Sequence, residues 1–368
     1  MSEDTLRVGL VGVGGVCAKV HYPGLRLIEG VELVGICEPS DTLRQKRQAD
    51  WGIDAAFGEL DELLTAVKPD AVFIATPNVY HQELIFAALD AGCHVICEKP
   101  LGMNFAQTQE IYARGKASGK HHMTAFTYRF VPAMNYIRHL VQTGALGQIR
   151  HARFQRLQDW GERAIGWRQY KDQAGSGELG DMGIHRLDFA EDLLGPIAAV
   201  CGHAKQLVPR DITKNGDPCP PQDVEDWIAW IAEFESGTTG VFEMGKLANG
   251  HGPEGDHDQA EFNGTEASAV YQLHNPHEIL FAPRGEPYQS QPVPEEFLKR
   301  PGAPRDPAVG DPVVTFRYDQ AWEFVSAIRA GRDCVPSFYH GMRAQAVADS
   351  ILEAAATRRW VDIPDCPV

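Results

Sequence analysis

The chain has 368 residues and a formal net charge of −16, and its 43% hydrophobic and 23% charged residues suit a packed protein of two domains. The negative charge repels nucleic-acid phosphates and anionic lipids, and no apolar run has the length of a membrane helix, so we expect no nucleic acid and no membrane as partner. An acidic start without a secretory signal, and eight cysteines without Cys-x-x-Cys spacing, predict a cytoplasmic protein with reduced thiols and no metal site of the zinc kind.

In the first third of the chain, short apolar runs alternate with amphipathic stretches. The expected strands are Arg7–Val11, Val31–Cys37, Ala71–Ala75 and His94–Cys97. The expected helices are Val16–Glu29, a stretch from about Asp41, Leu60–Val67, Val79–Ala91 and Phe105–Ser118. Strands that alternate with helices predict a parallel sheet, and hence an α/β domain, here residues 1–127.

The pattern changes after about Phe126, and residues 128–368 are expected to form an α+β domain. Its expected strands are Ile149–Leu157, Trp227–Glu235, Thr239–Lys246, Gln259–Phe262, Ala267–Leu273 and Glu278–Phe281. Hairpin signals at Ser236-Gly237 and Asn263-Gly264 predict a large, open and mostly antiparallel sheet. Residues 283–312, rich in Pro and Gly, are expected to form an irregular loop, followed by helices Tyr318–Ala330 and Gly341–Ala356.

A glycine-rich turn, Gly12-Val13-Gly14-Gly15-Val16-Cys17, follows the first strand. In a Rossmann turn the first glycine makes the bend, the second lets the backbone approach a pyrophosphate, and the next helix points its N-terminus at the phosphates. Cys17 replaces the third glycine, and a purely structural turn is the alternative. Glu38 ends the second strand, where a carboxylate accepts ribose hydroxyls and repels a 2′-phosphate, which favours NAD over NADP. Arg44 is either a receptor for that phosphate or a solvated helix residue.

Polar residues also follow two later strands. Thr76-Pro77-Asn78 with His81 comes after one strand, and Glu98-Lys99-Pro100 comes after the next. Ligands bind beyond the carboxyl ends of parallel strands, so Lys99 would lie near a nicotinamide ring. The spacing alone fits a charged pair before an ordinary turn equally well.

A third cluster places Asp181, His185 and Asp188 at i, i+4 and i+7, which is one face of a helix. A histidine beside a carboxylate is the usual acid–base group near neutral pH, and oxidation of an alcohol needs such a base. A helix-capping Asp181 with a core His185 is the other interpretation. His251, His257 and Asp258 form either a metal site or a solvated loop.

These clusters, in this order, resemble the glucose–fructose oxidoreductase / inositol dehydrogenase family (Gfo/Idh/MocA). The resemblance covers nearly the whole chain and includes Tyr128-Arg129-Phe130 and Trp167-Arg168. It implies an N-terminal Rossmann domain for NAD(P) and a C-terminal domain whose open sheet makes subunit contacts, as in a homodimer or homotetramer. It also implies that His185 accepts a proton, that Asp181 orients His185, and that Lys99 donates to the reacting oxygen.

The activity that this resemblance implies is an NAD(P)-dependent dehydrogenase acting on a secondary alcohol of a sugar or polyol. The candidate cofactor-binding residues are Gly12, Val13, Gly14, Gly15, Val16, Glu38, Thr76, Pro77, Asn78, His81, Glu98 and Lys99. The candidate substrate-binding residues are Lys99, Tyr128, Trp167, Arg168, Asp181 and His185. Trp160 is either a further indole that packs on a pyranose face or an ordinary core or interface residue. Tyr128 and Arg129 either touch substrate or support the domain junction. The alternatives are an NAD-dependent glycosidase that oxidises its sugar transiently and a catalytically silent NAD-binding sensor.

Overall fold

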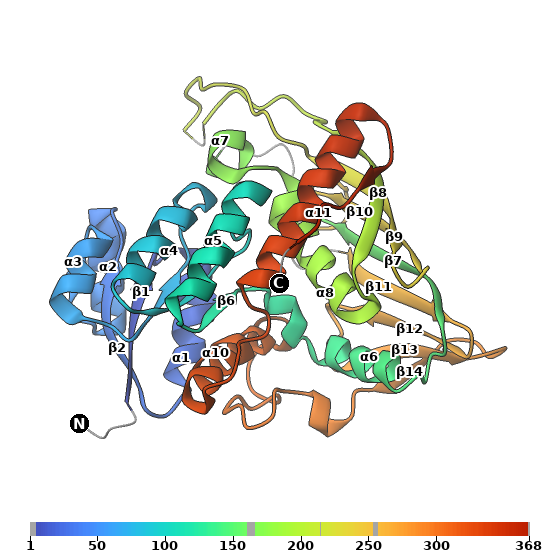
Figure 1. The fold of residues 1–368 in the computed structure, drawn as a ribbon, viewed down its shortest axis with the longest axis horizontal. Helices are drawn as coiled ribbons and strands as arrows, with labels where there is room; N and C mark the ends of the chain where they lie inside the picture. The colour runs from blue at the N-terminus through green and yellow to red at the C-terminus, as the bar shows by residue number, and fades with distance from the viewer. Residues whose placement is uncertain (1–4, 160–165, 214, 253–256, 367–368) are drawn as a thin grey trace. The chain divides into compact units, whose positions relative to one another are not determined.

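The computed structural model describes residues 5–159, 166–213, 215–252 and 257–366, which divide into two compact units (Figure 1). Unit 1 comprises Met1–Thr127 with Arg300–Met342, and unit 2 comprises Tyr128–Lys299 with Arg343–Val368. The expected second domain, residues 128–368, therefore differs from unit 2, because residues 300–342 belong to unit 1.

Helix α10 (Asp319–Ala330) explains why this late segment belongs to unit 1. The ring of its Phe324 packs edge-on against Phe73 of the first sheet, with ring centroids 5.4 Å apart. Both side chains are fully buried. The apolar face of α10 is thus part of the core of unit 1, although more than 200 residues separate the two rings along the chain.

The sheet of unit 1 is entirely parallel, as predicted, and its strand order is β3-β2-β1-β4-β5-β6. The strands are β1 Leu6–Val11, β2 Val31–Cys37, β3 Ala56–Phe57, β4 Ala71–Ile74, β5 His94–Cys97 and β6 His122–Thr124. The helices α2 Asp41–Trp51, α3 Leu60–Val67, α4 His81–Asp90 and α5 Phe105–Ser118 connect them, and α4 and α5 lie side by side (Figure 1). The strand order reverses between β1 and β4, which is where such sheets bind ligands.

The helix after the glycine turn differs from the predicted Val16–Glu29. It consists of a π-helical turn, η1 (Cys17–His21), and a short α1 (Tyr22–Arg26). Pro23 has no amide hydrogen, and in a regular α-helix its ring would clash with the carbonyl four residues earlier. The wider π-turn avoids this clash, and Gly30, with φ +70°, turns the chain into β2.

The sheet of unit 2 has the strand order β14-β13-β12-β11-β7-β10-β9-β8-β15. The strands are β7 Ile149–Leu157, β8 Ile197–Lys205, β9 Trp227–Phe234, β10 Thr239–Gly245, β11 His257–Gly264, β12 Ala267–Gln272, β13 Glu278–Pro283, β14 Gln289–Pro292 and β15 Val361–Asp362. All neighbouring pairs are antiparallel except β7 with β10. This confirms the predicted, mostly antiparallel sheet and both hairpins.

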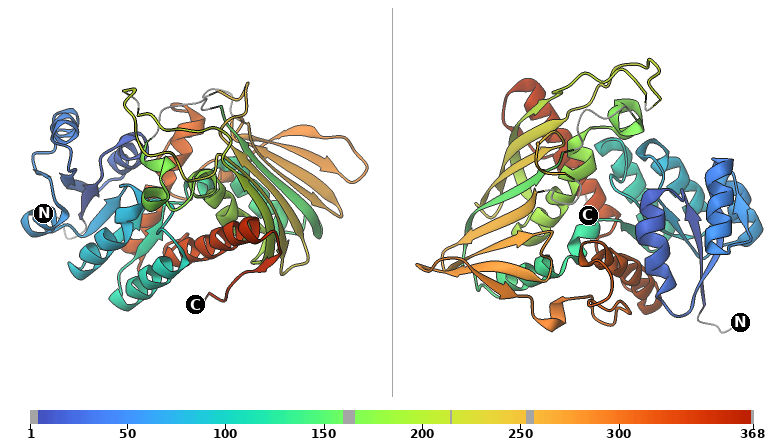
Figure 2. Two further views of the ribbon diagram at one scale, coloured as in Figure 1. Left: turned by 90° about the horizontal axis from the view of Figure 1, so that it is seen from above. Right: turned by 180° about the vertical axis from the view of Figure 1, so that it is seen from behind.

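One face of this sheet carries the core of unit 2. Phe242 stacks between Phe154 and Trp230, with ring centroids at 4.3 and 4.7 Å. Helices α6 (Pro132–Gln142), α8 (Ile184–Leu194) and most of α11 (Phe338–Thr357) cover this face, whereas no described helix covers the opposite face (Figure 2). Ile231 and Val241 are 41% and 46% exposed on their strands.

The remaining elements are short. They are η2 Asn78–Tyr80, η3 Thr127–Phe130, η4 Trp167–Gln169, α7 Lys171–Ala174, η5 Leu179–Gly183, η6 Glu295–Phe297, α9 Pro312–Thr315 and η7 Phe316–Tyr318. Strand β8 was not predicted, and β14 and η6 lie within the stretch expected to be irregular. In the described part of the chain, no helix combines the length and apolar character needed to cross a bilayer.

Candidate active site

The glycine turn after β1 has the backbone geometry of a ligand cradle. Gly12 has φ +78°, and a Cβ there would lie 2.7 Å from the carbonyl oxygen of Ala75, so only glycine fits. At Gly14 and Gly15 a Cβ would meet no protein atom within 4 Å. The protein surface is therefore open above these two residues.

Glu38 points into this turn. Its carboxylate accepts hydrogen bonds from the Val13 amide at 3.2 Å and the Ser40 amide at 3.1 Å. Arg44 is held beside it, donating to the Glu38 carbonyl oxygen at 2.6 Å and pairing with Asp41. The turn thus presents a carboxylate, and the nearby guanidinium is already engaged.

His81 braces the loops that follow β4 and β5. Its Nδ1 lies 2.8 Å from the Pro100 carbonyl oxygen and its Nε2 lies 3.1 Å from the Thr76 carbonyl oxygen. The ring is fully buried, and this burial lowers its pKa. His81 can therefore shape a cofactor site through these loops, whereas Asn78, Thr76 and Pro77 form the loop itself.

Glu98, at the end of β5, is tied to the helix after the glycine turn. Its Oε1 lies 2.8 Å from Nε2 of buried His21, and its Oε2 accepts from the Lys99 amide at 3.3 Å. Burial by itself would raise the pKa of Glu98, but the hydrogen bond from His21 and the charges of His21 and Lys99 hold it below its usual value. Gln320 approaches the other nitrogen of His21 at 3.4 Å. Sequence reasoning missed His21, whose only local signal is its place in the helix after the turn.

In unit 2, Tyr128 and His185 form a buried pair. Their ring centroids are 4.7 Å apart, and the guanidinium carbon of Arg186 lies 4.5 Å from the centroid of Tyr128. His185 is on the first turn of α8, and Tyr128 is on η3. Two candidate residues that are 57 positions apart in the sequence are thus brought together.

A second group in unit 2 gathers at Asp181, on the π-turn η5. Arg168 places its Nε 3.5 Å from the Asp181 Oδ1, and its guanidinium carbon lies 4.3 Å from the centroid of Trp167. Trp167, Arg168 and Asp181 are partly exposed, so a ligand can reach them. Trp160, the other candidate indole, lies outside the described residues.

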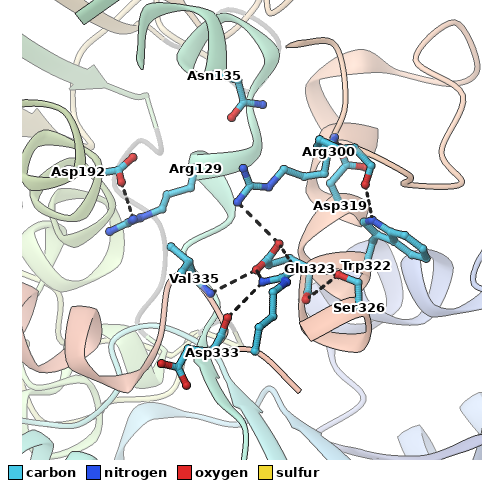
Figure 3. A network of polar contacts seen from close by, with 12 residues as sticks. Arg129, Asn135, Asp192, Arg300, Asp319, Trp322, Glu323, Ser326, Asp333 and Val335 are labelled. Carbon is cyan, nitrogen blue, oxygen red and sulfur yellow. Dashed lines mark hydrogen bonds and ion pairs between the residues drawn. The ribbon is translucent and has the colours of Figure 1, made fainter. Parts of the chain in front are cut away.

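Asp188, the third residue of the predicted face, has a different partner from Asp181. Both oxygens of Asp188 accept from Arg129 at 2.7 Å. Figure 3 shows that Arg129 also donates to Asp192, at 2.7 Å. Asp181 lies on the π-turn η5 and pairs with Arg168, whereas Asp188 lies on α8, so the two carboxylates have different partners. The Arg129–Asp188 pair instead anchors α8 to η3.

Asp258 contradicts both interpretations of its stretch. It lies on β11, which begins two residues earlier than predicted, and is buried with Arg156 and Arg186 as its partners. The rings of His251 and His257 are 5.7 Å apart. Among the described residues, no group of three His, Cys, Asp or Glu side chains could hold a metal ion.

Two family models match the chain. Residues 6–126 match an oxidoreductase family with an NAD-binding Rossmann fold, and residues 134–270 match the GFO/IDH/MocA C-terminal domain. Levoglucosan dehydrogenase of Pseudarthrobacter phenanthrenivorans is 30% identical in sequence over 98% of this chain and 99% of that protein. The chain belongs to the GFO/IDH/MocA oxidoreductase family.

Further GFO/IDH/MocA relatives are similar over long stretches. D-glucoside 3-dehydrogenase of Escherichia coli is 33% identical over 64% of this chain and 69% of that protein. A solved structure of levoglucosan dehydrogenase in complex with NADH and levoglucosan has a TM-score of 0.89 and 28% identity, over 98% of this chain and all of that one. The expected family, its NAD-binding Rossmann domain and its relationship to sugar dehydrogenases are therefore confirmed.

The residues of unit 1 fit the NAD of a GFO/IDH/MocA enzyme. The open surface at Gly14 and Gly15 leaves room for a pyrophosphate at the start of a helix, and Glu38 offers an acceptor for ribose hydroxyls at the end of β2. The loops after β4 and β5 supply the polar groups beyond the carboxyl ends of the neighbouring strands.

Proposed function

We propose that this protein is an NAD-dependent dehydrogenase that oxidises a secondary alcohol of a sugar or polyol, with NAD supplying the hydride acceptor when bound. The observation that carries the proposal is the pairing of a buried imidazole, His185, with a neighbouring turn that presents Asp181, Arg168 and Trp167. A silent sensor would have no use for a proton acceptor held in this way.

The preference for NAD over NADP rests on Glu38 and Arg44. A carboxylate at the ribose position accepts hydrogen bonds from two hydroxyls and repels a 2′-phosphate. Arg44 is bonded to Asp41 and to the Glu38 carbonyl, so its guanidinium is not presented to a phosphate.

The chain's own residues would divide the chemistry as follows. His185 takes the hydroxyl proton of the substrate, and Asp181 favours the charged imidazolium that results. Lys99 donates a hydrogen bond to the same oxygen and so lowers the cost of negative charge developing there. Tyr128 fixes the plane of the His185 ring by packing against it.

Substrate recognition is assigned to Trp167 and Arg168. An indole face packs against the apolar face of a pyranose, and a guanidinium donates paired hydrogen bonds to neighbouring hydroxyls. Asp181 pairs with Arg168 and so already holds its side chain in place. Loss of Trp167 or of Arg168 should therefore raise KM more than it lowers kcat.

The test is turnover by the purified protein with NAD and a panel of unphosphorylated sugars, anhydrosugars, glucosides and inositols, followed by the absorbance of reduced nicotinamide. We expect Lys99→Ala and His185→Ala to lose turnover by a factor of about 100 or more while leaving the affinity for NAD largely intact. Lys116→Ala, at an exposed position on α5, is the matched control and should behave as the wild type. Full activity in both site variants would refute the mechanism, and turnover without net NADH would instead support the transient-oxidation glycosidase.

We further propose that the chain forms a homodimer or homotetramer through the outer face of the sheet in unit 2. Ile231 and Val241 lie directly opposite one another on β9 and β10 and form an apolar patch on that face. Replacing both by Lys should convert the oligomer to a monomer in light scattering, and an unchanged mass would exclude this surface.

We also propose a cytoplasmic location. All eight cysteines are free thiols, and Cys17, Cys37, Cys93, Cys97 and Cys334 are buried. Such thiols persist in a reducing compartment. Recovery of the protein in a periplasmic or secreted fraction would contradict this assignment.

A further inference from the structure

Glu178 is a buried acid immediately before the π-turn that carries Asp181. It is 2% exposed, and its Oε1 finds no hydrogen-bond partner among the described residues. Its backbone amide donates to the Glu225 carbonyl oxygen at 3.3 Å, which fixes the start of the turn against the strand connection before β9. A carboxylate in this position would carry a poorly solvated charge.

The charged groups around Glu178 come from four elements. They are Asp181 on η5, Glu225 before β9, Lys246 after β10 and Arg156 on β7. Each cation is already engaged: Lys246 Nζ lies 3.6 Å from the Asp226 Oδ1, and Arg156 pairs with Asp258 at 2.6 Å. Glu178 therefore has two acidic neighbours and shares both cations with other carboxylates.

We propose that Glu178 is a positioning acid of this dehydrogenase, which keeps its proton at neutral pH and so adds no second negative charge to the turn that carries Asp181. Its effect on catalysis rests on the proposed function, whereas its protonation does not. Burial, reinforced by the charge of Asp181, raises the pKa of Glu178 to about 8. Two adjacent carboxylates ionise together only at a cost, and the more buried one keeps the proton.

The protonated state has a consequence for the neighbouring groups. While Glu178 is neutral, the Arg168 Nε lies 3.5 Å from the Asp181 Oδ1, and Trp167 packs against Arg168. When Glu178 releases its proton, a second negative charge lies in the turn beside Asp181, and the two carboxylates repel each other. The arrangement that binds substrate is thus tied to a proton on a residue that does not itself touch substrate.

The experiment compares the pH dependence of kcat/KM in the wild type and in Glu178→Gln, from about pH 6 to about pH 10. In the wild type, kcat/KM should fall about tenfold as Glu178 ionises, which is the equivalent of one pKa unit of interaction. Glutamine keeps the length and never ionises, so this fall should be absent in Glu178→Gln. Glu62→Gln, exposed on α3, is the matched control and should keep the wild-type profile.

A second measurement does not depend on turnover. The infrared difference spectrum between the wild type and Glu178→Gln should show the carbonyl band of a protonated carboxyl group at neutral pH, which disappears above the pKa. Absence of that band, or an alkaline fall that persists in Glu178→Gln, would overturn the proposal. If the wild type turned over no sugar or polyol, the proposed function would fail while the infrared band still decided the protonation of Glu178. Should Glu178→Gln not fold, Glu178→Met serves as the uncharged variant of similar length.

Discussion

Replacing Asp258 by Asn should destabilise the fold far more than the loss of a surface charge. The side chains of Asp258 and Arg186 are 0% and 1% exposed, and that of Arg156 is 7% exposed. Both guanidinium groups reach the same oxygen, Oδ2, of Asp258. Asparagine keeps the shape of the side chain but removes the negative charge to which both buried guanidinium groups are bonded.

The size of the effect follows from this burial. Breaking a buried ion pair by removing one partner costs about 3–5 kcal/mol, because the other charge stays buried without compensation. Asp90→Asn is the matched control, because Asp90 and its partner Arg114 are 57% and 50% exposed and such pairs contribute about 0–1 kcal/mol.

Urea denaturation measures the difference. With an m-value of about 3 kcal/mol per molar, the midpoint of Asp258→Asn should lie about 1–1.7 M below that of the wild type, and Asp90→Asn should stay within about 0.3 M. Catalysis should also fall in Asp258→Asn, because Arg186 lies over Tyr128, which packs against His185. Equal midpoints for the two variants would refute the interpretation of these residues as a mutually compensating buried set.

Three other predictions separate binding from folding. Gly14→Ala should fold normally, because its Cβ meets no protein atom, but its NAD affinity measured by calorimetry should fall at least about tenfold. Gly12→Ala should instead lose about 1–3 kcal/mol of stability. Equal NAD affinity of Gly14→Ala and the wild type would exclude the glycine turn as the cofactor site. Glu38→Ala should lower the preference for NAD over NADP, measured as a ratio of kcat/KM, by about tenfold or more, and an unchanged ratio would remove Glu38 from cofactor selection. Because the pKa of Glu178 is raised to about 8, the folded chain holds a proton that the unfolded chain has released above about pH 5. The wild type should therefore lose stability relative to Glu178→Gln as the pH rises to about 8, by up to about 1.4 kcal/mol per pH unit in urea titrations, and parallel curves would contradict this linkage.

The elements that could be predicted are those with strong local patterns. The predicted strand Ile149–Leu157 has the same bounds as β7 in the structure. Ser236-Gly237 predicted the hairpin between β9 and β10. Strand β8 was not predicted because its sequence, IAAVCGHAK, has no clear alternation of apolar and polar residues and contains Gly202. A Cβ at Gly202 would lie 3.3 Å from Trp230 and 3.4 Å from Ile351, which is a tight fit that only the folded chain reveals.

The candidate site divides in the same way. The glycine turn and the segment Glu98-Lys99-Pro100 could be recognised because each motif lies within a few residues of chain. The hydrogen bond between His21 and Glu98 joins residues 77 positions apart, so no local sequence pattern predicts it. Asp258 was misinterpreted for the same reason, because its neighbours in sequence are glycine-rich and its partners lie 72 and 102 positions away.

The three acids along η5 and α8 show what spacing can and cannot specify. Glu178 shares its surrounding cations with other carboxylates, Asp181 faces the partly exposed Arg168, and Asp188 is clamped by Arg129 through both oxygens. Sequence spacing brought two of them into one hypothesis, but their charge states depend on side chains contributed by β7, η3 and η4. A catalytic assignment within this stretch therefore requires the partners of each carboxylate, because proximity to His185 along the helix does not distinguish an acid that holds a proton from one that supplies a charge.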